Sequence, residues 1–131
     1  LKISSLPDAF SDDELMRQVW TNLISNALKY SSSKPKPVIE IGATEEDGNY
    51  VYFVKDNGVG FDMHYYNKLF GVFQRLHSQN EFPGTGIGLA LVEKIIAKHG
   101  GKIWADAKVN EGATFYFLLP KSNSGTLNNL I

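Results

Sequence analysis

The stretch Gln18–Tyr30, QVWTNLISNALKY, decides the fold of this chain. Its apolar residues recur three and four positions apart, which predicts an amphipathic helix with one face in a core. The residues of that face are Met16, Val19, Trp20, Leu23, Ile24, Ala27 and Leu28. Core packing does not account for Asn22, Asn26 and Lys29, which stand at i, i+4 and i+7 and therefore share one edge of the helix. This edge needs a second explanation.

Asparagine is a mediocre residue for a helix interior, because its side chain competes for backbone hydrogen bonds. A solvated helix face is the simpler interpretation of two such residues one turn apart. We favour a magnesium–nucleotide site, because Mg²⁺ prefers oxygen ligands and takes most of them from water and substrate phosphates. Asn26 would then offer an amide oxygen to the metal, and Lys29 would reach a phosphate.

Composition sets limits on the function. The chain has 131 residues, a hydrophobic share of 43%, a charged share of 21%, a net charge of −1 and no cysteine. This length suits one domain with a substantial core. The small net charge provides no field that would recruit nucleic acid or an anionic membrane. The lack of cysteine excludes disulfides, thiolate metal sites and cysteine catalysis. We find no apolar run long enough to cross a bilayer, and no signal-peptide pattern at the start.

The order of expected elements is β-α-β-β-loop-α-β-β. It predicts an α/β fold, a two-layer sandwich with one mixed sheet of about five strands and helices on one face. Residues 45–49 and 110–112 are expected to form turns between paired strands. The expected strands are Lys2–Ser5, Val38–Thr44, Tyr50–Lys55, Lys102–Ala107 and Thr114–Leu119.

The first helix is expected to start at a capping box formed by Ser11 and Glu14 and to end near Tyr30. The second is expected over Leu89–His99, stopped by Gly100-Gly101.

Two further segments join these elements. Residues 65–73 are expected to form a short helix or turn, and residues 74–84 a mobile loop. We expect one domain over residues 1–120 and a flexible tail over residues 121–131.

Asp56-Asn57-Gly58-Val59-Gly60 directly follows an expected strand. Asn-Gly is a strong hairpin signal, but no alternating strand follows it here. A carboxylate at this point can accept a hydrogen bond from the amino group of adenine, and it would repel guanine, which presents an acceptor there. Gly58 and Gly60 would let the backbone approach a flat ring.

Gly84-Thr85-Gly86-Ile87-Gly88 leads into the second helix. Glycines before a helix present backbone N–H groups and a positive dipole end to phosphate. The dinucleotide fingerprint and the ordinary phosphate-binding loop are both absent, as are the protein kinase signatures. This motif therefore indicates a nucleotide site only in combination with the other two motifs.

Together, and in this order, these segments resemble the ATP-binding catalytic domain of sensor histidine kinases. That domain has the Bergerat-type fold shared with gyrase-type topoisomerases, Hsp90 chaperones and MutL repair proteins. The resemblance extends from about Leu1 to Pro120, and the wording of residues 73–77 is most similar to phytochrome-type kinases. The family has five conserved boxes, and each has a counterpart here. They are the N box at Gln18–Ser31, the first glycine box at Asp56–Gly60, the F box at Leu69–Phe73, the second glycine box at Gly84–Leu89 and the final glycine box at Glu111–Phe115.

The resemblance implies a catalytic set on the first helix. Asn26 would ligate magnesium, Asn22 would support the phosphate end of the site, and Lys29 would contact phosphate. ATP-hydrolysing relatives have a glutamate at position 22 that activates water, whereas an asparagine cannot accept a proton near neutral pH. We therefore expect bound ATP to be kept for another acceptor.

The remaining implied contacts surround the rest of the nucleotide. Tyr30 would line the adenine pocket, Asp56 would bind the adenine amino group, and Gly58 and Gly60 would make room for the base. The other implied nucleotide-binding residues are Arg75 and His77 on the ATP lid, Gly84, Thr85, Gly86, Ile87, Gly88 and Leu89 beside the triphosphate, and Thr114 in the final glycine box.

The phosphate acceptor of the family is a histidine, typically followed by an acidic residue, on a separate dimerisation domain. None of His64, His77 and His99 has such a neighbour. The resemblance thus implies an excised catalytic domain that uses Mg²⁺ and ATP. Its implied partners are an upstream dimerisation domain and a downstream response regulator, without nucleic acid or direct membrane contact.

Two alternatives remain open from the sequence. One is a serine kinase of the anti-sigma type, which uses a related fold. The other is a degenerate docking module that binds nucleotide weakly or not at all. In each case we expect a cytoplasmic domain, whether the parent protein is soluble or membrane-anchored.

Overall fold

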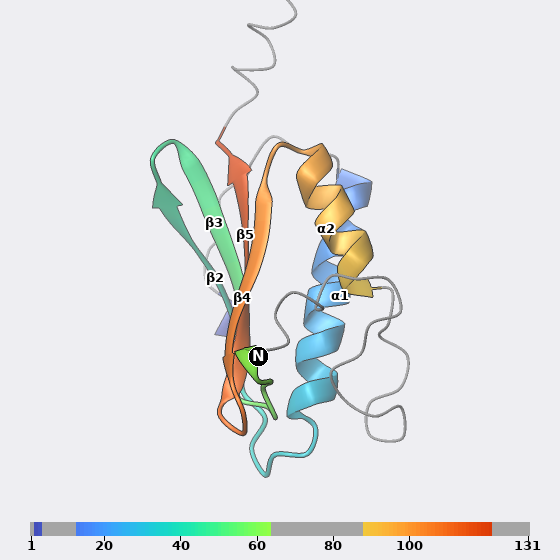
Figure 1. Cartoon of the computed structure of the whole chain (residues 1–131), viewed down its shortest axis with the longest axis vertical. Coiled ribbons are helices and arrows are strands. Elements are labelled where there is room, and N and C mark those ends of the chain that lie inside the picture. The colour runs from blue at the N-terminus through green and yellow to red at the C-terminus, as the bar shows by residue number, and fades with distance from the viewer. Residues whose placement is uncertain (1, 4–12, 64–87, 122–131) are drawn as a thin grey trace, which may run out of the picture.

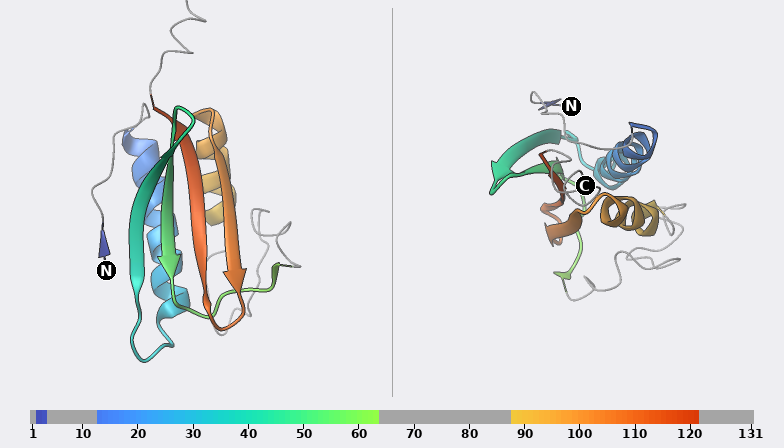
Figure 2. Two further views of the ribbon diagram at one scale, coloured as in Figure 1. Left: turned by 90° about the vertical axis from the view of Figure 1, so that its left-hand side faces the viewer. Right: turned by 90° about the horizontal axis from the view of Figure 1, so that it is seen from above.

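The structure, a computed structural model, describes residues 2–3, 13–63 and 88–121. These residues form two layers, a sheet and a pair of helices that cover one of its faces (Figures 1 and 2). The described elements are β1 (Lys2–Ile3), α1 (Asp13–Ser31), β2 (Ile39–Glu46), β3 (Asn49–Asp56), α2 (Gly88–Lys98), β4 (Lys102–Lys108) and β5 (Gly112–Pro120).

The five described strands have the order β1-β2-β3-β5-β4. β1 is parallel to β2, and the other neighbours are antiparallel. The predicted mixed sheet with helices on one face is therefore confirmed. β4 is one residue longer than predicted at its C-terminal end, and β5 is longer at both ends, since ladder pairing continues toward the turn between them.

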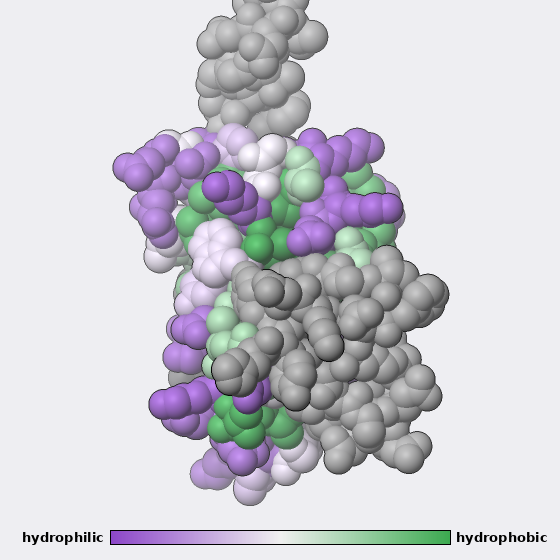
Figure 3. Space-filling model, viewed as in Figure 1, coloured by the Kyte–Doolittle hydropathy of each residue, from purple (hydrophilic) through white to green (hydrophobic). Residues whose placement is uncertain are grey.

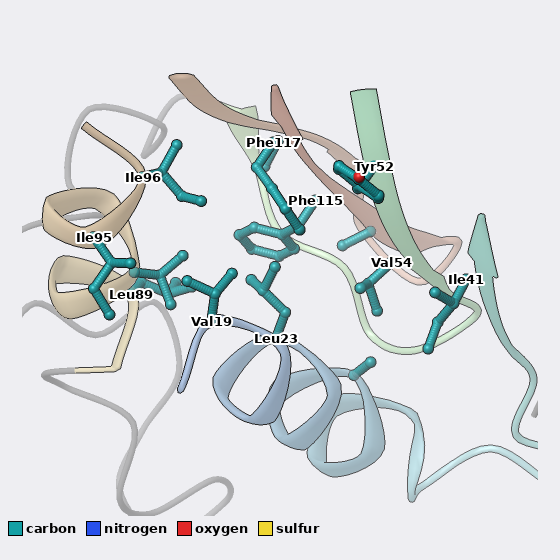
Figure 4. Close-up of a cluster of buried hydrophobic side chains, with 14 of the residues drawn as sticks. Val19, Leu23, Ile41, Tyr52, Val54, Leu89, Ile95, Ile96, Phe115 and Phe117 are labelled. Carbon is teal, nitrogen blue, oxygen red and sulfur yellow. The ribbon is translucent and has the colours of Figure 1, made fainter. Parts of the chain in front are cut away.

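The α1 helix packs through the face that its periodicity predicts. Val19 and Leu23 are 0% and 1% exposed and lie against Phe117 of β5 (Figure 4). The ring of Trp20 lies edge-on to the ring of Phe117, with 5.0 Å between centroids. Leu28, which the sequence placed on this face, is 57% exposed. The predicted apolar stripe was too wide, because the curved sheet covers a narrower part of the helix surface.

Both turns between antiparallel strands depend on positive backbone angles. The β2–β3 hairpin turns at Asp47 and Gly48, with φ of 47° and 81°. Two successive positive φ values define the type I′ turn that Asp-Gly favours, so this turn is shorter than the expected residues 45–49. The β4–β5 turn has Asn110 and Gly112 at φ of 64° and 116°.

The α2 helix ends in the motif that Gly100-Gly101 predicts. Gly100 has φ of 77°. Its N–H donates to the carbonyl of Ala97, and the N–H of Gly101 donates to the carbonyl of Ile96, both at 3.0 Å. This pair of bonds is the Schellman arrangement, which satisfies carbonyls at the end of a helix. The helix therefore stops one residue before the predicted His99.

Several expectations lie outside the described residues. They are the capping role of Ser11, the short helix or turn at residues 65–73, the loop at residues 74–84 and the tail from residue 122. Lys121, expected at the start of the tail, is held on the sheet. Its N–H donates to the Gly48 carbonyl at 3.2 Å, and its Nζ lies 2.8 Å from Glu45 Oε2.

Polar and charged side chains cover much of the described surface seen in Figure 3, with apolar side chains between them. The exposed large hydrophobic residues come from separate elements and include Leu28, Leu91 and Val109. No helix within the described residues has the length and apolar content needed to span a membrane.

Two leucines of α1 provide a matched test of this packing. Leu23→Ala is expected to lower the free energy of unfolding by about 2–5 kcal/mol, because it leaves a cavity in the core. Leu28→Ala is expected to change it by about 0.5 kcal/mol or less. Urea denaturation of both variants measures the difference. Equal losses in the two variants would contradict the described packing of α1.

Candidate functional site

The amide of Asn26 is the first polar group of the site. Asn26 is 5% exposed, and among the described residues its Nδ2 has no hydrogen-bond partner. A buried donor without a partner destabilises a fold by about 1–3 kcal/mol. A half-turn of the amide plane exchanges nitrogen for oxygen, so this position can present either a donor or an acceptor. The amide therefore suits a bound group that supplies the missing interaction.

Asn22 lies one turn before Asn26 on α1. It is half-buried, and its Nδ2 donates to the carbonyl of Gln18 at 2.8 Å. This bond holds the side chain along the helix. The structure thus aligns the two amides as their spacing predicts.

Lys29 and Tyr30 are both half-buried in the last turn of α1. The carbonyl of Tyr30 accepts a hydrogen bond at 3.0 Å from the N–H of Val59, which belongs to the segment after β3. A carbonyl at a helix C-terminus has no partner within the helix. The segment after β3 therefore caps α1.

Asp56, the last residue of β3, is a buried carboxyl group with 4% exposure. Its Oδ1 accepts a hydrogen bond from the N–H of Gly58 at 2.8 Å. Burial raises the pKa of the Asp56 carboxyl, and hydrogen bonds from the backbone of Gly58 and Ala113 offset part of this rise. A buried carboxyl with a perturbed pKa beside a loop is a candidate for a functional site.

Gly58 brings Asp56 next to the end of α1. A Cβ on Gly58 would collide with the carbonyl of Tyr30 and would lie 2.9 Å from Asp56 Oδ1. These two groups are therefore neighbours in space. Because Asn26 and Tyr30 are four residues apart on α1, they share a helix face. The structure thus brings the amide edge of α1 and the carboxyl of Asp56 to the same end of the molecule.

The two glycines after Asp56 have a role that the sequence did not predict. A Cβ on Gly60, which has φ of 61°, would collide with the carbonyl of Lys108, the last residue of β4. Gly58 and Gly60 therefore lack side chains because protein backbone fills that space. The expected reason was room for an adenine ring. Whether backbone atoms of this segment also contact a base stays a prediction.

Thr114 lies one position beyond the residue of β5 that pairs with Asp56. In the β3–β5 ladder, Ala113 is opposite Asp56 and Thr114 is opposite Lys55. Successive residues of a strand point to opposite faces of the sheet. Thr114 consequently faces away from α1 and α2 and lines a hollow of about 500 Å³ that also includes Trp104 and Tyr116. Thr114 also lines a second hollow, of about 340 Å³, together with Asp56 and Ala113, and its contact with a nucleotide stays a prediction. Ala113, one position earlier, lies on the side of Asp56.

The second glycine motif is described only at its end. Arg75, His77 and residues 84–87 lie outside the described part of the chain. Gly88 is the first residue of α2, which lies beside α1 (Figure 1). The side chain of Leu89 is 8% exposed and belongs to the core. A contact between Leu89 and a phosphate would therefore come from its backbone.

The described residues contain no group of three or more His, Cys, Asp and Glu side chains that could hold a metal ion. A metal at Asn26 would thus take most of its ligands from water and phosphate. Mg²⁺ is commonly bound in this way, with one or two protein ligands. The buried Asn26 amide, whose Nδ2 has no partner among the described residues, fits that arrangement.

Burial of Asp56 predicts a pH dependence of stability. The folded state binds the Asp56 proton more tightly than the unfolded state, since its pKa is raised from the usual 3.8. The stabilising contribution of this group is therefore present at low pH and is lost as pH rises through the folded pKa. Relative to wild type, Asp56→Asn should gain stability across that window, which pH-resolved urea denaturation measures. A stability difference that is constant or falls as pH rises would contradict this account.

Known proteins share both the sequence and the fold. The family described as "Histidine kinase-, DNA gyrase B-, and HSP90-like ATPase" matches residues 11–123. Phytochrome-like protein Cph1 of Synechocystis sp. is 40% identical over 123 residues, which are 94% of this chain and 16% of that protein.

Solved structures of known proteins share the fold of this chain. Mycobacterial sensor histidine kinase MprB has a TM-score of 0.81 at 24% identity, over 92% of this chain and 82% of that chain. Full-length ShkA in complex with AMPPNP has a TM-score of 0.75 at 26% identity, over 91% of this chain and 25% of that chain.

The predicted resemblance, including a phytochrome-like relative, is confirmed by these matches. The chain spans 16% of the length of Cph1, so it corresponds to one part of such a protein. Sensor histidine kinase WalK of Bacillus subtilis is 37% identical over 124 residues, which are 90% of this chain and 20% of that protein. The chain belongs to the family of histidine kinase-, DNA gyrase B- and HSP90-like ATPases, within which it corresponds to the ATP-binding catalytic domain of sensor histidine kinases.

Proposed function

We propose that this chain binds Mg-ATP and presents the γ-phosphate to a histidine on a separate dimerisation domain. One observation carries the proposal. The buried side-chain amide of Asn26, whose Nδ2 has no partner among the described residues, lies on α1. The N–H of Val59 joins the end of α1 to the segment that follows Asp56. Membership of an ATPase family supports ATP as the ligand, and the names of the relatives support histidine as the acceptor.

The base is recognised at the Asp56 end. An ionised carboxylate accepts a hydrogen bond from the amino group of adenine, whereas guanine presents a carbonyl oxygen at that position. Because Asp56 is 4% exposed, little water competes for its oxygens. A buried polar group that loses its partner discriminates strongly between ligands. Tyr30, whose backbone carbonyl lies near Asp56 at Gly58, would line the same pocket.

The triphosphate lies along the amide edge of α1 in this proposal. Asn26 offers one amide oxygen to Mg²⁺, which neutralises negative charge on the phosphoryl group that is transferred. Lys29, half-buried and one turn further along α1, supplies an ammonium group for a phosphate oxygen. Asn22 lies one turn before Asn26 and holds the edge in line through its bond to Gln18.

The residue at position 22 separates transfer from hydrolysis. An asparagine amide does not accept a proton near neutral pH, so Asn22 cannot activate water as a general base. Bound ATP is therefore hydrolysed slowly and remains available to a histidine. We accordingly propose that the isolated chain binds nucleotide with little turnover, and that its partners are a dimerisation domain and, downstream, a response regulator. We also propose that this domain lies in the cytoplasm, where ATP is available as its substrate.

Asn26→Ala tests the metal end of the site. The variant is expected to lower the affinity for ATP in the presence of Mg²⁺ by roughly tenfold or more, by analogy with the loss of groups that support a metal. Without Mg²⁺, variant and wild type should bind ATP similarly. Isothermal titration calorimetry with MgCl₂ or with EDTA measures both affinities. Equal magnesium-dependent affinities would remove Asn26 from the site.

The acceptor is tested by mixing the chain with a histidine-bearing dimerisation domain and radiolabelled ATP. Phosphohistidine is expected, which loses its label in acid and keeps it in base. A domain with the acceptor histidine replaced by glutamine serves as the control. An acid-stable product that persists in this control would instead support the serine kinase.

A further inference from the structure

Asn57 follows Asp56 and makes three hydrogen bonds to the segment that leaves α1. Its N–H donates to the carbonyl of Val38 at 3.2 Å, and its Oδ1 accepts from the N–H of Val38 at 2.9 Å. Its Nδ2 donates to the carbonyl of Lys36 at 2.8 Å. All polar groups of the side chain amide thus contact one short stretch of backbone.

These bonds extend the sheet past its last ladder pair. The β2–β3 register ends with Ile39 opposite Asp56. A primary amide offers the same donor and acceptor as a peptide group. The Asn57 side chain therefore continues the pairing with residues 36–38, while the main chain is free to turn toward α1.

The main chain then reaches α1 at Val59, whose N–H donates to the Tyr30 carbonyl at 3.0 Å. The result is a closed ring, which runs from Tyr30 along residues 31–38 to Asn57 and back through Val59. The carboxyl of Asp56 is attached to this ring through the N–H of Gly58. In Figure 2 the segment after β3 runs past the end of α1 at the same pole of the molecule.

We propose that Asn57 is a positioning residue for adenine recognition, which acts through Asp56 without touching nucleotide. The inference rests on the proposed function. The ring is closed at two places, by the Asn57 amide on residues 36–38 and by the Val59 N–H on the Tyr30 carbonyl. Without the amide, only the backbone bonds of Asn57 and Val59 remain, and the turn after Asp56 moves more freely relative to the segment that leaves α1. The apparent affinity for adenine is then the intrinsic affinity multiplied by the fraction of molecules in which Asp56 is aligned.

This role differs from general support of the fold. Misalignment of Asp56 removes a hydrogen bond that adenine makes and guanine does not. GTP binding, which depends on the phosphates and the metal, should change less than ATP binding. The preference for ATP over GTP is therefore the quantity that separates the two roles.

The experiment uses the whole chain and measures the affinities of Mg-ATP and Mg-GTP by calorimetry, below the melting temperature of every variant. Asn57→Ala is expected to weaken ATP binding by about tenfold, as for the loss of one to two hydrogen bonds, and to lower the ATP-over-GTP preference. Asn57→Asp keeps the acceptor for Val38 but cannot donate to Lys36. Its ATP affinity and its ATP-over-GTP preference should lie between those of wild type and Asn57→Ala. Asn49→Ala is the matched control, because Asn49 Nδ2 bonds the Asp47 carbonyl at 3.4 Å at the far end of β3.

The outcomes separate this inference from the proposed function. A wild-type preference for ATP that both Asn57 variants retain would overturn the positioning role alone. An equal loss in Asn49→Ala would overturn it as well, since the effect would not be local. A wild-type chain that binds neither nucleotide would overturn the proposed function, and this inference with it. Should Asn57→Ala fail to fold, Asn57→Asp decides the result.

Discussion

The hydrogen bond from the N–H of Val59 to the carbonyl of Tyr30 joins the two halves of the site. It satisfies a helix-terminal carbonyl, which otherwise depends on water or a cap. It also requires glycine at position 58, because a Cβ there would collide with that carbonyl. The polar edge of α1 and the buried carboxyl at the end of β3 are thereby held as one unit, although 30 residues separate Asn26 from Asp56 in the sequence.

The site buries polar side chains, whereas the rest of the described core buries mainly apolar ones. Elsewhere the buried side chains are mainly apolar, as with Val19, Leu23 and Phe117. At this pole a buried amide lacks a described partner and a buried carboxyl has a raised pKa. Both features lower the stability of the free domain. Such local conflicts concentrate at functional sites, where a ligand supplies the missing interactions.

Much of the fold and of the site could be predicted because the responsible signals are local. Helical spacing located α1 and its amide edge, and Gly100-Gly101 located the end of α2. The errors arose where tertiary structure decides. Leu28 fits the apolar pattern but is exposed, since the sheet covers less of the helix than the pattern suggests. The sequence alone also did not show that Ala113, and not Thr114, is opposite Asp56, an offset of one residue that in a strand reverses the face.

The sequence alone also did not show why positions 58 and 60 are glycine, Gly58 and Gly60, and the reason is again tertiary structure. The atoms they make room for belong to Tyr30 and Lys108, which are distant along the chain. The role of Asn57 was missed because Asn-Gly has an ordinary meaning as a turn signal. Its contacts with Lys36 and Val38 appear only once β2 and β3 are paired.

The central claim is that Asn26 and Asp56 contact opposite ends of one nucleotide. A crystal structure of this chain with Mg²⁺ and a non-hydrolysable ATP analogue tests it most directly. The account predicts an oxygen of the Asn26 amide at about 2.1 Å from the metal and a carboxylate oxygen of Asp56 within hydrogen-bond distance of the adenine amino group. A nucleotide bound elsewhere, such as in the hollow beside Trp104 and Tyr116 on the open face of the sheet, would contradict it.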